Sequence, residues 1–434
     1  MPRHCILRHR ASVMAARSRM DIILQLGVVQ NMPLQTRRFG CARFYDIREA
    51  RRVLIMLRQL ERPSQFAACA APPTTVMPRV NTFEQNLSLS LFTFEHLPPV
   101  LAMGGLFSSR APKFDPAKDL ADLTGKVAIV TGGNSGIGYA TVQHLARQGA
   151  KVYIGARSEE RAKAAIERLR AEGLQPRNGE LEWLELDLSD PRKAKASAEA
   201  FLAKEKQLDI LVNNAGVMRI PYKIDSTYGI QQNMVVNHFS PFVFTKALLP
   251  LLTETAKEPG SDVRIVIVSS QTIGMMKGRD VHFRDINEIN EKFGNGMFSD
   301  MYRYAYSKLA NALYAKQLQR RVDLEGIPIT VMALHPGSVN TEGLRQDPSA
   351  SIPILGRLVQ FVMEHFLTGA SKGAYASSFA AASPIVKAER DKYKGAYLDP
   401  PGKIVPPPAP EAESTELAEE LWATTETILQ SFDL

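Results

Sequence analysis

The stretch TGGNSGIGYA, residues 131–140, lies between the apolar run KVAIV (126–130) and a helix-like sequence that continues to residue 149. It places four glycines within seven positions, although glycine loses more backbone entropy on folding than any other residue. Such a cluster at a strand-to-helix turn indicates that a ligand must approach the main chain closely. Because the free N–H groups at a helix N-terminus attract anions, a phosphate group is the natural candidate.

Short apolar runs alternate with helical sequences from about residue 115 onward. Their apolar residues are consecutive, as in strands that are buried on both faces. Strands that alternate with helices predict an α/β fold, namely a doubly wound, Rossmann-type parallel sheet of about seven strands with helices on both faces. The strand candidates are 126–131, 151–156, 181–186, 210–213, 264–269, 330–334 and 395–398, and an amphipathic helix is expected at 414–432.

The charge of the chain is unevenly distributed. Residues 1–110 contain 15 Arg, no Lys and 6 Asp or Glu, and they account for the whole of the net charge of +8. We predict a basic, poorly structured extension over 1–110 and one domain over 115–434. An Arg-rich, acid-poor start also fits a mitochondrial targeting segment, and MGGLFSSR (103–110) would fit an acylation signal if translation began at Met103. The expected location is cytoplasmic, with mitochondrial and membrane-associated locations left open.

Several classes of function are disfavoured. The remainder of the chain is close to neutral, so no nucleic-acid partner is expected. Its lack of cysteine rules out a disulfide framework. No uninterrupted apolar run reaches membrane-span length, no metal site is expected, and a homodimer is left open.

The glycine turn has the spacing T-G-x-x-x-G-x-G. We expect Gly132 to allow a sharp turn after the strand, Gly136 to allow a pyrophosphate to approach, and Gly138 to allow close packing of the helix on the sheet. Cofactor-binding candidates in this turn also include Thr131, Asn134, Ser135 and Ile137.

A second motif supplies candidate chemistry. In RYAYSKLANALYAKQL, Tyr304 and Lys308 are four residues apart on a predicted helix, so both lie on one face. A nearby ammonium should lower the phenol pKa and make Tyr304 a usable acid or base. Tyr302 and Tyr306 have no lysine at this spacing and are expected to pack.

Together, these motifs resemble the short-chain dehydrogenase/reductase family over residues 123–400. The resemblance implies a catalytic group of Ser270, Tyr304 and Lys308, with Asn237 holding a proton-relay water. Cofactor contacts are implied for NNAG (Asn214, Ala215 and Gly216) and for HPGSVNT (Pro336, Gly337, Val339 and Thr341). Details such as VNHFSPFVFT and LHPG are most similar to the branch of retinol dehydrogenases and WW-domain oxidoreductases, without a WW domain.

The cofactor type is predicted from the end of the second strand. Arg157 stands where an acidic residue would bind the ribose of NAD, which favours NADP(H) over NAD. Asp187 and Leu188 match the family's adenine-binding position. His238 and His335 are interpreted as structural.

The expected function is an NADP(H)-dependent oxidoreductase that interconverts an alcohol and a carbonyl, and the substrate is expected to be small and lipophilic. The apolar residues of 352–363 suit a lid, contact with a membrane surface, or a helix packed on the sheet. The alternative is a catalytically idle dinucleotide-binding scaffold that acts through partners.

Overall fold

The structure is a computed structural model that describes residues 114–296, 298–337 and 370–434 of the chain. The predictions for residues 1–110, including the stretch 103–110, and for 352–363 lie outside these ranges. Everything below refers to the described ranges.

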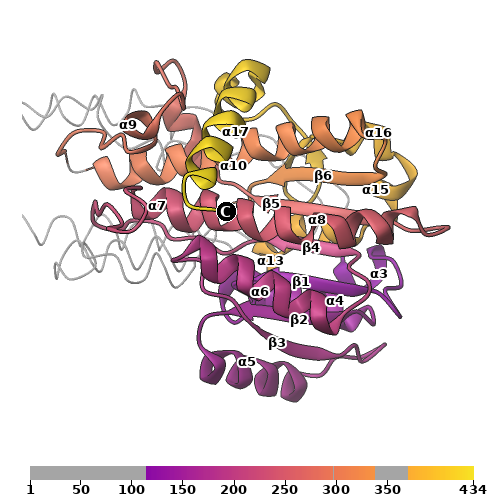
Figure 1. Cartoon of the computed structure of the whole chain (residues 1–434). Coiled ribbons are helices and arrows are strands. Elements are labelled where there is room, and N and C mark those ends of the chain that lie inside the picture. Colours follow the sequence, from indigo (N-terminus) through magenta and orange to yellow (C-terminus); the bar gives the residue numbers. More distant parts are fainter. Residues whose placement is uncertain (1–113, 297, 338–369) are drawn as a thin grey trace, which may run out of the picture. The chain divides into compact units, whose positions relative to one another are not determined.

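One sheet of eight strands organises the domain, in the order β3-β2-β1-β4-β5-β6-β7-β8 (Figure 1). Strands β1 to β7 pair in parallel, and β8 runs antiparallel to β7. The predicted Rossmann-type sheet is therefore confirmed, with all seven predicted strands present and one short strand added. The strands are β1 (Val127–Thr131), β2 (Lys151–Ala156), β3 (Leu181–Glu185), β4 (Ile210–Asn213), β5 (Val263–Val268), β6 (Ile329–Leu334), β7 (Tyr397–Asp399) and β8 (Lys403–Ile404).

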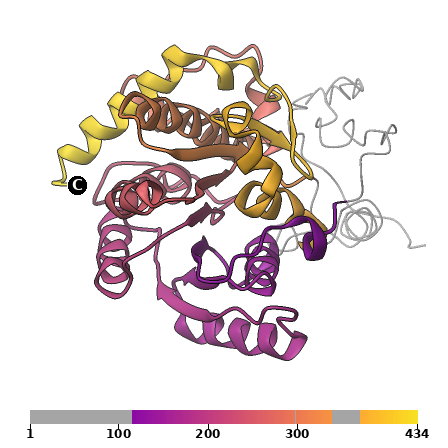
Figure 2. The ribbon, with the colours of Figure 1, turned by 90° about the vertical axis from the view of Figure 1, so that its right-hand side faces the viewer.

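Helices cover both faces of this sheet (Figures 1 and 2). One face packs against α6 (Pro191–Lys204), α8 (Ser240–Lys257) and α10 (Ser299–Leu324), and the other against α4 (Gly136–Arg147), α5 (Glu159–Glu172) and α14 (Tyr375–Ala382). Neighbouring residues of one strand pack into the cores on opposite faces of the sheet. In β1, Ile129 packs on the face covered by α6, α8 and α10, and Val130 on the face covered by α4, α5 and α14. This explains why the strand sequences are continuously apolar.

The remaining elements are short connections and one terminal helix. They are α3 (Pro116–Asp119), α7 (Gln232–Met234), the π-helical turn η2 (Val235–Phe239), the 3₁₀ turn η3 (Gln271–Met276), α9 (Ile286–Ile289), α13 (Ala370–Gly373), α15 (Pro384–Ala388), α16 (Arg390–Tyr393), the 3₁₀ turn η5 (Pro410–Glu413) and α17 (Thr415–Gln430). The run Gln232–Lys257 has the length and mean hydropathy of a membrane span, but 67% of its most apolar stretch is buried within the fold. It is a core helix here.

The predicted C-terminal helix is present as α17, and it packs on α8 and α10. Its Trp422 contacts the rings of Phe242 on α8 and Tyr314 on α10, with centroid distances of 4.8 and 5.8 Å. The guanidinium of Arg321 stacks over the same indole at 4.3 Å. The apolar stripe of this helix is therefore buried against the domain.

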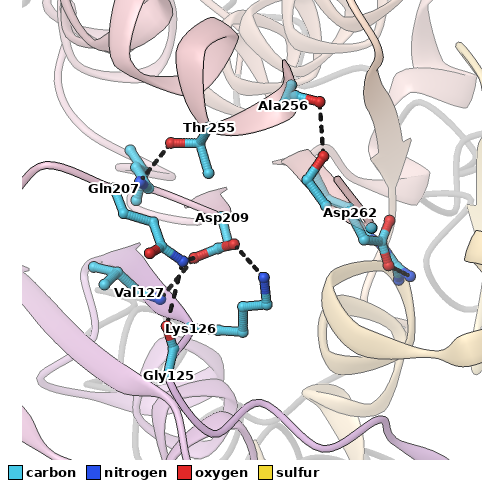
Figure 3. Close-up of polar contacts among 12 residues, drawn as sticks. Gly125, Lys126, Val127, Gln207, Asp209, Thr255, Ala256 and Asp262 are labelled. Carbon is cyan, nitrogen blue, oxygen red and sulfur yellow. Dashed lines mark hydrogen bonds and ion pairs between the residues drawn. The ribbon is translucent and has the colours of Figure 1, made fainter. Parts of the chain in front are cut away.

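A polar network ties the strands together at their amino ends (Figure 3). The carboxylate of Asp209, just before β4, accepts hydrogen bonds from the Val127 N–H at 2.9 Å, from Lys126 Nζ at 3.0 Å and from Gln207 Nε2 at 2.6 Å. Thr255 of α8 accepts from the neighbouring Leu208 N–H at 3.1 Å. The start of β1, the start of β4 and the end of α8 are thus fixed at this edge, which leaves the carboxyl ends of the strands for the site.

Candidate active site

The glycine turn connects β1 to α4 at the carboxyl edge of the sheet. Gly132 and Gly136 have φ angles of +67° and +55°, which favour glycine. A Cβ at Gly136 would meet only open space. Ser135, the N-cap residue of α4, makes no side-chain cap, and the first turn holds no acidic residue. The main-chain N–H groups in the first turn of α4 are therefore available for an anion such as a dinucleotide phosphate.

Gly138 and Thr131 serve the packing around this turn. A Cβ at Gly138 would lie 2.3 Å from the Gly132 carbonyl oxygen and 2.6 Å from Asn214 Nδ2, so the expected close helix packing is present. Thr131 Oγ1 accepts from the N–H groups of Asn214 and Ala215 at 3.0 and 2.9 Å. Both residues support the turn from behind and do not line the cavity in front of it.

A cavity of about 740 Å³ extends from the glycine turn to the carboxyl ends of β4, β5 and β6. Most of the predicted binding residues line it together, although they come from seven separate segments of the chain. These residues are Gly132, Asn134, Ser135, Gly136, Ile137, Arg157, Asp187, Leu188, Asn214, Ala215, Gly216, Ser270, Tyr304, Lys308, Pro336 and Gly337. The predicted contacts Val339 and Thr341 lie outside the described residues.

The sequence analysis missed several side chains of this cavity. Met218, Gln232, Met275 and Met301 line it near the catalytic candidates. Met301 precedes Tyr304 by three residues, so helical periodicity could have identified it. Pro408 also lines the cavity, from the C-terminal tail, and carries no signal that would reveal this.

The end of β2 presents a cation to the cavity. Arg157 is exposed and lines the cavity. The first acidic residue after it, Glu159, forms an ion pair with Lys163 at 2.7 Å.

The carboxylate of Asp187 is held in place within the cavity wall. It accepts from the Ser189 hydroxyl at 2.7 Å and from Lys193 Nζ at 2.9 Å. Burial alone would raise the Asp187 pKa, but these partners outweigh it and the pKa is lowered. Asp187 is thus a fixed anion at the position matched to adenine binding.

Ser270, Tyr304 and Lys308 come together at the cavity wall. The Ser270 hydroxyl caps η3 by accepting from the Thr272 N–H at 3.2 Å, and its interaction with the Tyr304 hydroxyl acts to lower the Tyr304 pKa. Lys308 Nζ lies 5.8 Å from the centre of the Tyr304 ring and donates to the Val268 carbonyl at 2.8 Å. The neighbouring Ser269 instead donates to the Lys308 carbonyl, which supports the choice of Ser270.

The pKa values of this group differ from the sequence expectation. Removal from water raises the pKa of Tyr304 to about 12, and the hydrogen bond with Ser270 opposes this only in part. Burial lowers the pKa of Lys308 to about 8. The expected lowering of the Tyr304 pKa by Lys308 is therefore not found, because desolvation dominates both groups.

Tyr302 and Tyr306, the tyrosines of α10 that flank Tyr304, have packing roles. The single O–H of Tyr306 is shared between the carbonyls of His282 and Glu288, at 2.7 and 3.0 Å, which anchors the segment between η3 and α10. Tyr302 stacks on Phe293 and lies under Arg279, 4.2 Å from its guanidinium. Neither residue lines the cavity, as the spacing argument predicts.

Asn237 lies on η2, where the helix widens because of Pro241. In an α-helix the Asn237 carbonyl would accept from the N–H of residue 241, but proline has none. The Ser240 N–H bonds instead to the Val235 carbonyl, five residues back. When the Asn311 amide is oriented with its nitrogen toward the nearby carbonyl oxygens, this nitrogen donates to the Asn237 carbonyl at 2.7 Å. Asn311 thus replaces the N–H that Pro241 lacks.

The side chain of Asn237 clamps the chain that follows NNAG. Its Oδ1 accepts from the Val217 N–H at 2.7 Å, and its Nδ2 donates to the Val217 carbonyl and to the Ser307 hydroxyl, both at 2.9 Å. A Cβ at Gly216 would lie 3.1 Å from Asn237 Oδ1 and 3.2 Å from Lys308 Nζ. Asn237 therefore lies beside Lys308 behind the cavity wall, and its predicted water stays a prediction.

His238, the next residue, is fully enclosed. Its Nε2 lies 2.8 Å from Thr425 Oγ1 on α17, and burial lowers its pKa to about 3. A neutral, buried imidazole with a hydroxyl partner agrees with the structural role expected from the sequence.

Comparisons with known proteins agree with this geometry. The family model for short chain dehydrogenases matches residues 126–280. A short-chain dehydrogenase/reductase of Armillaria gallica is 44% identical over 314 residues, which cover 72% of this chain and 96% of that protein. Retinol dehydrogenase 14 of Mus musculus is 36% identical over 313 residues, with 70% and 86% covered. The crystal structure of an uncharacterized protein from Mycobacterium Paratuberculosis superposes with a TM-score of 0.52 and 26% identity, covering 72% of this chain and 97% of that one.

The parallel sheet, the glycine turn and the cavity at its carboxyl edge define a dinucleotide-dependent oxidoreductase. With the relatives above, the chain belongs to the short-chain dehydrogenase/reductase family, which uses NAD(P), and to its retinol dehydrogenase-like branch.

Proposed function

We propose that the chain is an NADP(H)-dependent reductase of lipophilic aldehydes or ketones that also catalyses the reverse oxidation. The observation that carries this proposal is the convergence of Ser270, Tyr304 and Lys308 on the cavity that also holds the glycine turn and Arg157. When bound, the cofactor supplies the hydride that reduces the carbonyl carbon.

The protein residues handle the oxygen and its proton. The Ser270 hydroxyl donates a hydrogen bond to the carbonyl oxygen, and the Tyr304 phenol transfers its proton to that oxygen as negative charge develops there. With a pKa near 12, Tyr304 stays protonated at neutral pH and is ready to act as the acid. Alcohol oxidation needs the tyrosinate, so its rate is expected to rise with pH.

The preference for NADP(H) rests on the charges around the end of β2. Arg157 is the exposed cation at the cavity rim, and a guanidinium can hold a 2′-phosphate with two hydrogen bonds. Glu159, the first acidic residue after Arg157, forms an exposed ion pair with Lys163 on α5, and it is not among the residues that line the cavity. These features favour a phosphorylated ribose over an unmodified one.

The lipophilic substrate class rests on three methionines of the cavity. Met218, Met275 and Met301 all line it. Methionine is apolar and adapts its shape, so this lining suits extended or unsaturated apolar groups. The name of retinol dehydrogenase 14 points to an alcohol of this kind for that relative.

The test is a panel of lipophilic and aromatic aldehydes and ketones, with the loss of NADPH absorbance as the readout. Tyr304→Phe should lower kcat by about 100-fold or more, with little change in NADPH affinity, because it removes only the proton donor. Tyr302→Phe, two residues before Tyr304 on the same helix, is the matched control and should retain turnover. Tight NADPH binding with no turnover across the panel would instead favour an idle scaffold.

A further inference from the structure

His335 stands directly after β6, in front of two residues of the cavity wall. Pro336 and Gly337 both line the cavity that holds Tyr304. Proline has no N–H, so the Gly337 N–H is the only main-chain donor of this pair. Gly337 has φ of +81°, a conformation that favours glycine. The group that accepts a hydrogen bond from the Gly337 N–H therefore fixes the orientation of this turn toward the cavity.

The imidazole of His335 uses both of its nitrogens. Its Nδ1 accepts from the Gly337 N–H at 3.1 Å, and its Nε2 lies 2.8 Å from Asp399 Oδ1 at the end of β7. A carboxylate can only accept, so the proton belongs on Nε2 and leaves Nδ1 free to accept. The His335 side chain is 4% exposed, whereas that of Asp399 is 42% exposed, so the imidazole is buried and its carboxylate partner reaches the surface.

Strand β7 thus supports two parts of the site. Asp399 fixes the His335 ring, and the Tyr397 hydroxyl donates to the Ser270 carbonyl at 3.2 Å. The His335 and Tyr397 rings are 5.9 Å apart. The turn at Gly337 and the catalytic Ser270 are therefore held from the same strand.

We propose that neutral His335, with its proton on Nε2, is a positioning residue that sets the Pro336–Gly337 turn for the nicotinamide half of the cofactor. Asp399 selects the required tautomer, as second-shell carboxylates do for other functional histidines. The inference rests on the proposed function, since it assumes that NADPH binds in this cavity.

Two variants separate the roles of the two nitrogens. In His335→Asn the amide oxygen takes the place of Nδ1 and can accept from Gly337, whereas in His335→Gln the amide nitrogen takes the place of Nε2 and reaches only Asp399. The dissociation constant of NADPH, followed by fluorescence on the full chain at pH 8, should rise about 5- to 10-fold in His335→Gln, as for the loss of one hydrogen bond. It should stay within about twofold in His335→Asn.

A third variant tests the partner of Nε2. Asp399→Asn keeps an acceptor for Nε2 without the charge and should bind NADPH like wild type at pH 8. Thermal unfolding of each variant reports whether the fold is intact.

The outcomes distinguish the inference from the function beneath it. If wild type does not bind NADPH, the proposed function fails. If wild type binds NADPH, but His335→Gln binds it as tightly as His335→Asn does, the proposed role of His335 is overturned.

Discussion

The buried ammonium of Lys308 should destabilise the fold at neutral pH, and Lys308→Met should therefore stabilise it while abolishing turnover. Lys308 is 3% exposed, and within the described part of the chain no carboxylate forms an ion pair with it. Among the described residues, its ammonium donates one hydrogen bond, to the Val268 carbonyl at 2.8 Å. Methionine has a similar shape and needs no charge compensation.

The magnitude follows from the two pKa values. The Lys308 pKa is about 8 in the fold and 10.5 in the reference state, and each pKa unit corresponds to about 1.4 kcal/mol, so the charged form costs about 3 kcal/mol of unfolding free energy. The lost hydrogen bond to Val268 removes about 1 kcal/mol of this gain. Lys308→Met should thus be about 2 kcal/mol more stable than wild type at pH 7.

The pH dependence of the free energy of unfolding tests separately whether the charged Lys308 destabilises the fold. Below pH 8 both the folded and unfolded states hold the proton, and the full destabilisation is present. Between pH 8 and 10.5 the unfolded chain still holds a proton that the fold has released, so wild type becomes more stable as pH rises. The advantage of Lys308→Met should then shrink by about 2 kcal/mol between pH 7 and pH 10.

Urea denaturation of wild type and Lys308→Met, at several pH values without cofactor, measures both effects. Lys316→Met on the same helix, where the side chain is only half-buried, is the matched control and should not produce a pH-dependent gap. A Lys308→Met variant that is less stable than wild type at pH 7, or a gap that does not change with pH, would refute the reasoning.

Three further substitutions test other parts of the structure. Arg157→Asp should shift cofactor preference toward NADH by about 10-fold or more, since it removes a charge-assisted contact and adds repulsion; kcat/KM for the two cofactors measures this, and an unchanged ratio would assign the phosphate to another cation such as Arg161. Gly138→Ala should lower the free energy of unfolding by about 1–3 kcal/mol, because its Cβ would overlap the Gly132 carbonyl; a neutral effect in urea denaturation would contradict the close packing. Tyr306→Phe should lower the free energy of unfolding by about 1–2 kcal/mol, because the hydroxyl contacts with His282 and Glu288 are lost, and turnover should be retained. A loss of turnover as large as that of Tyr304→Phe would mean that Tyr304 has been wrongly chosen as the proton donor.

The parts of the fold that were predictable are those with local signals. Strands β1, β4, β5 and β6 carry runs of apolar residues because every one of their residues is buried, whereas the edge strand β3 includes Glu182 and Glu185 and is only partly buried. The spacing of Gly132, Gly136 and Gly138 encodes a turn whose backbone angles and close contact are found in the structure. The four-residue spacing of Tyr304 and Lys308 likewise placed both on one face of α10.

The features that escaped prediction depend on three-dimensional neighbours. The pKa of Tyr304 follows from desolvation by residues far apart in the sequence, so a single lysine four residues away could not determine it. The support of the site by Asp399 and the lining by Pro408 come from the C-terminal region, with no motif to mark them. Thr131 belongs to the motif, yet its hydroxyl serves the backbone of β4 and not the cavity.

The order of strands in the sheet has a consequence for how the chain is made. After β1, β2 and β3 have formed one half of the sheet, β4 joins β1, and β5, β6, β7 and β8 then attach to the same open edge in the order in which the ribosome releases them. Each new strand finds its template already exposed, which suits folding during synthesis. The cavity, however, needs residues from Gly132 to Pro408. The complete cavity therefore forms only after Pro408 has joined the fold, and before that point strand pairing and the apolar cores hold the growing sheet together.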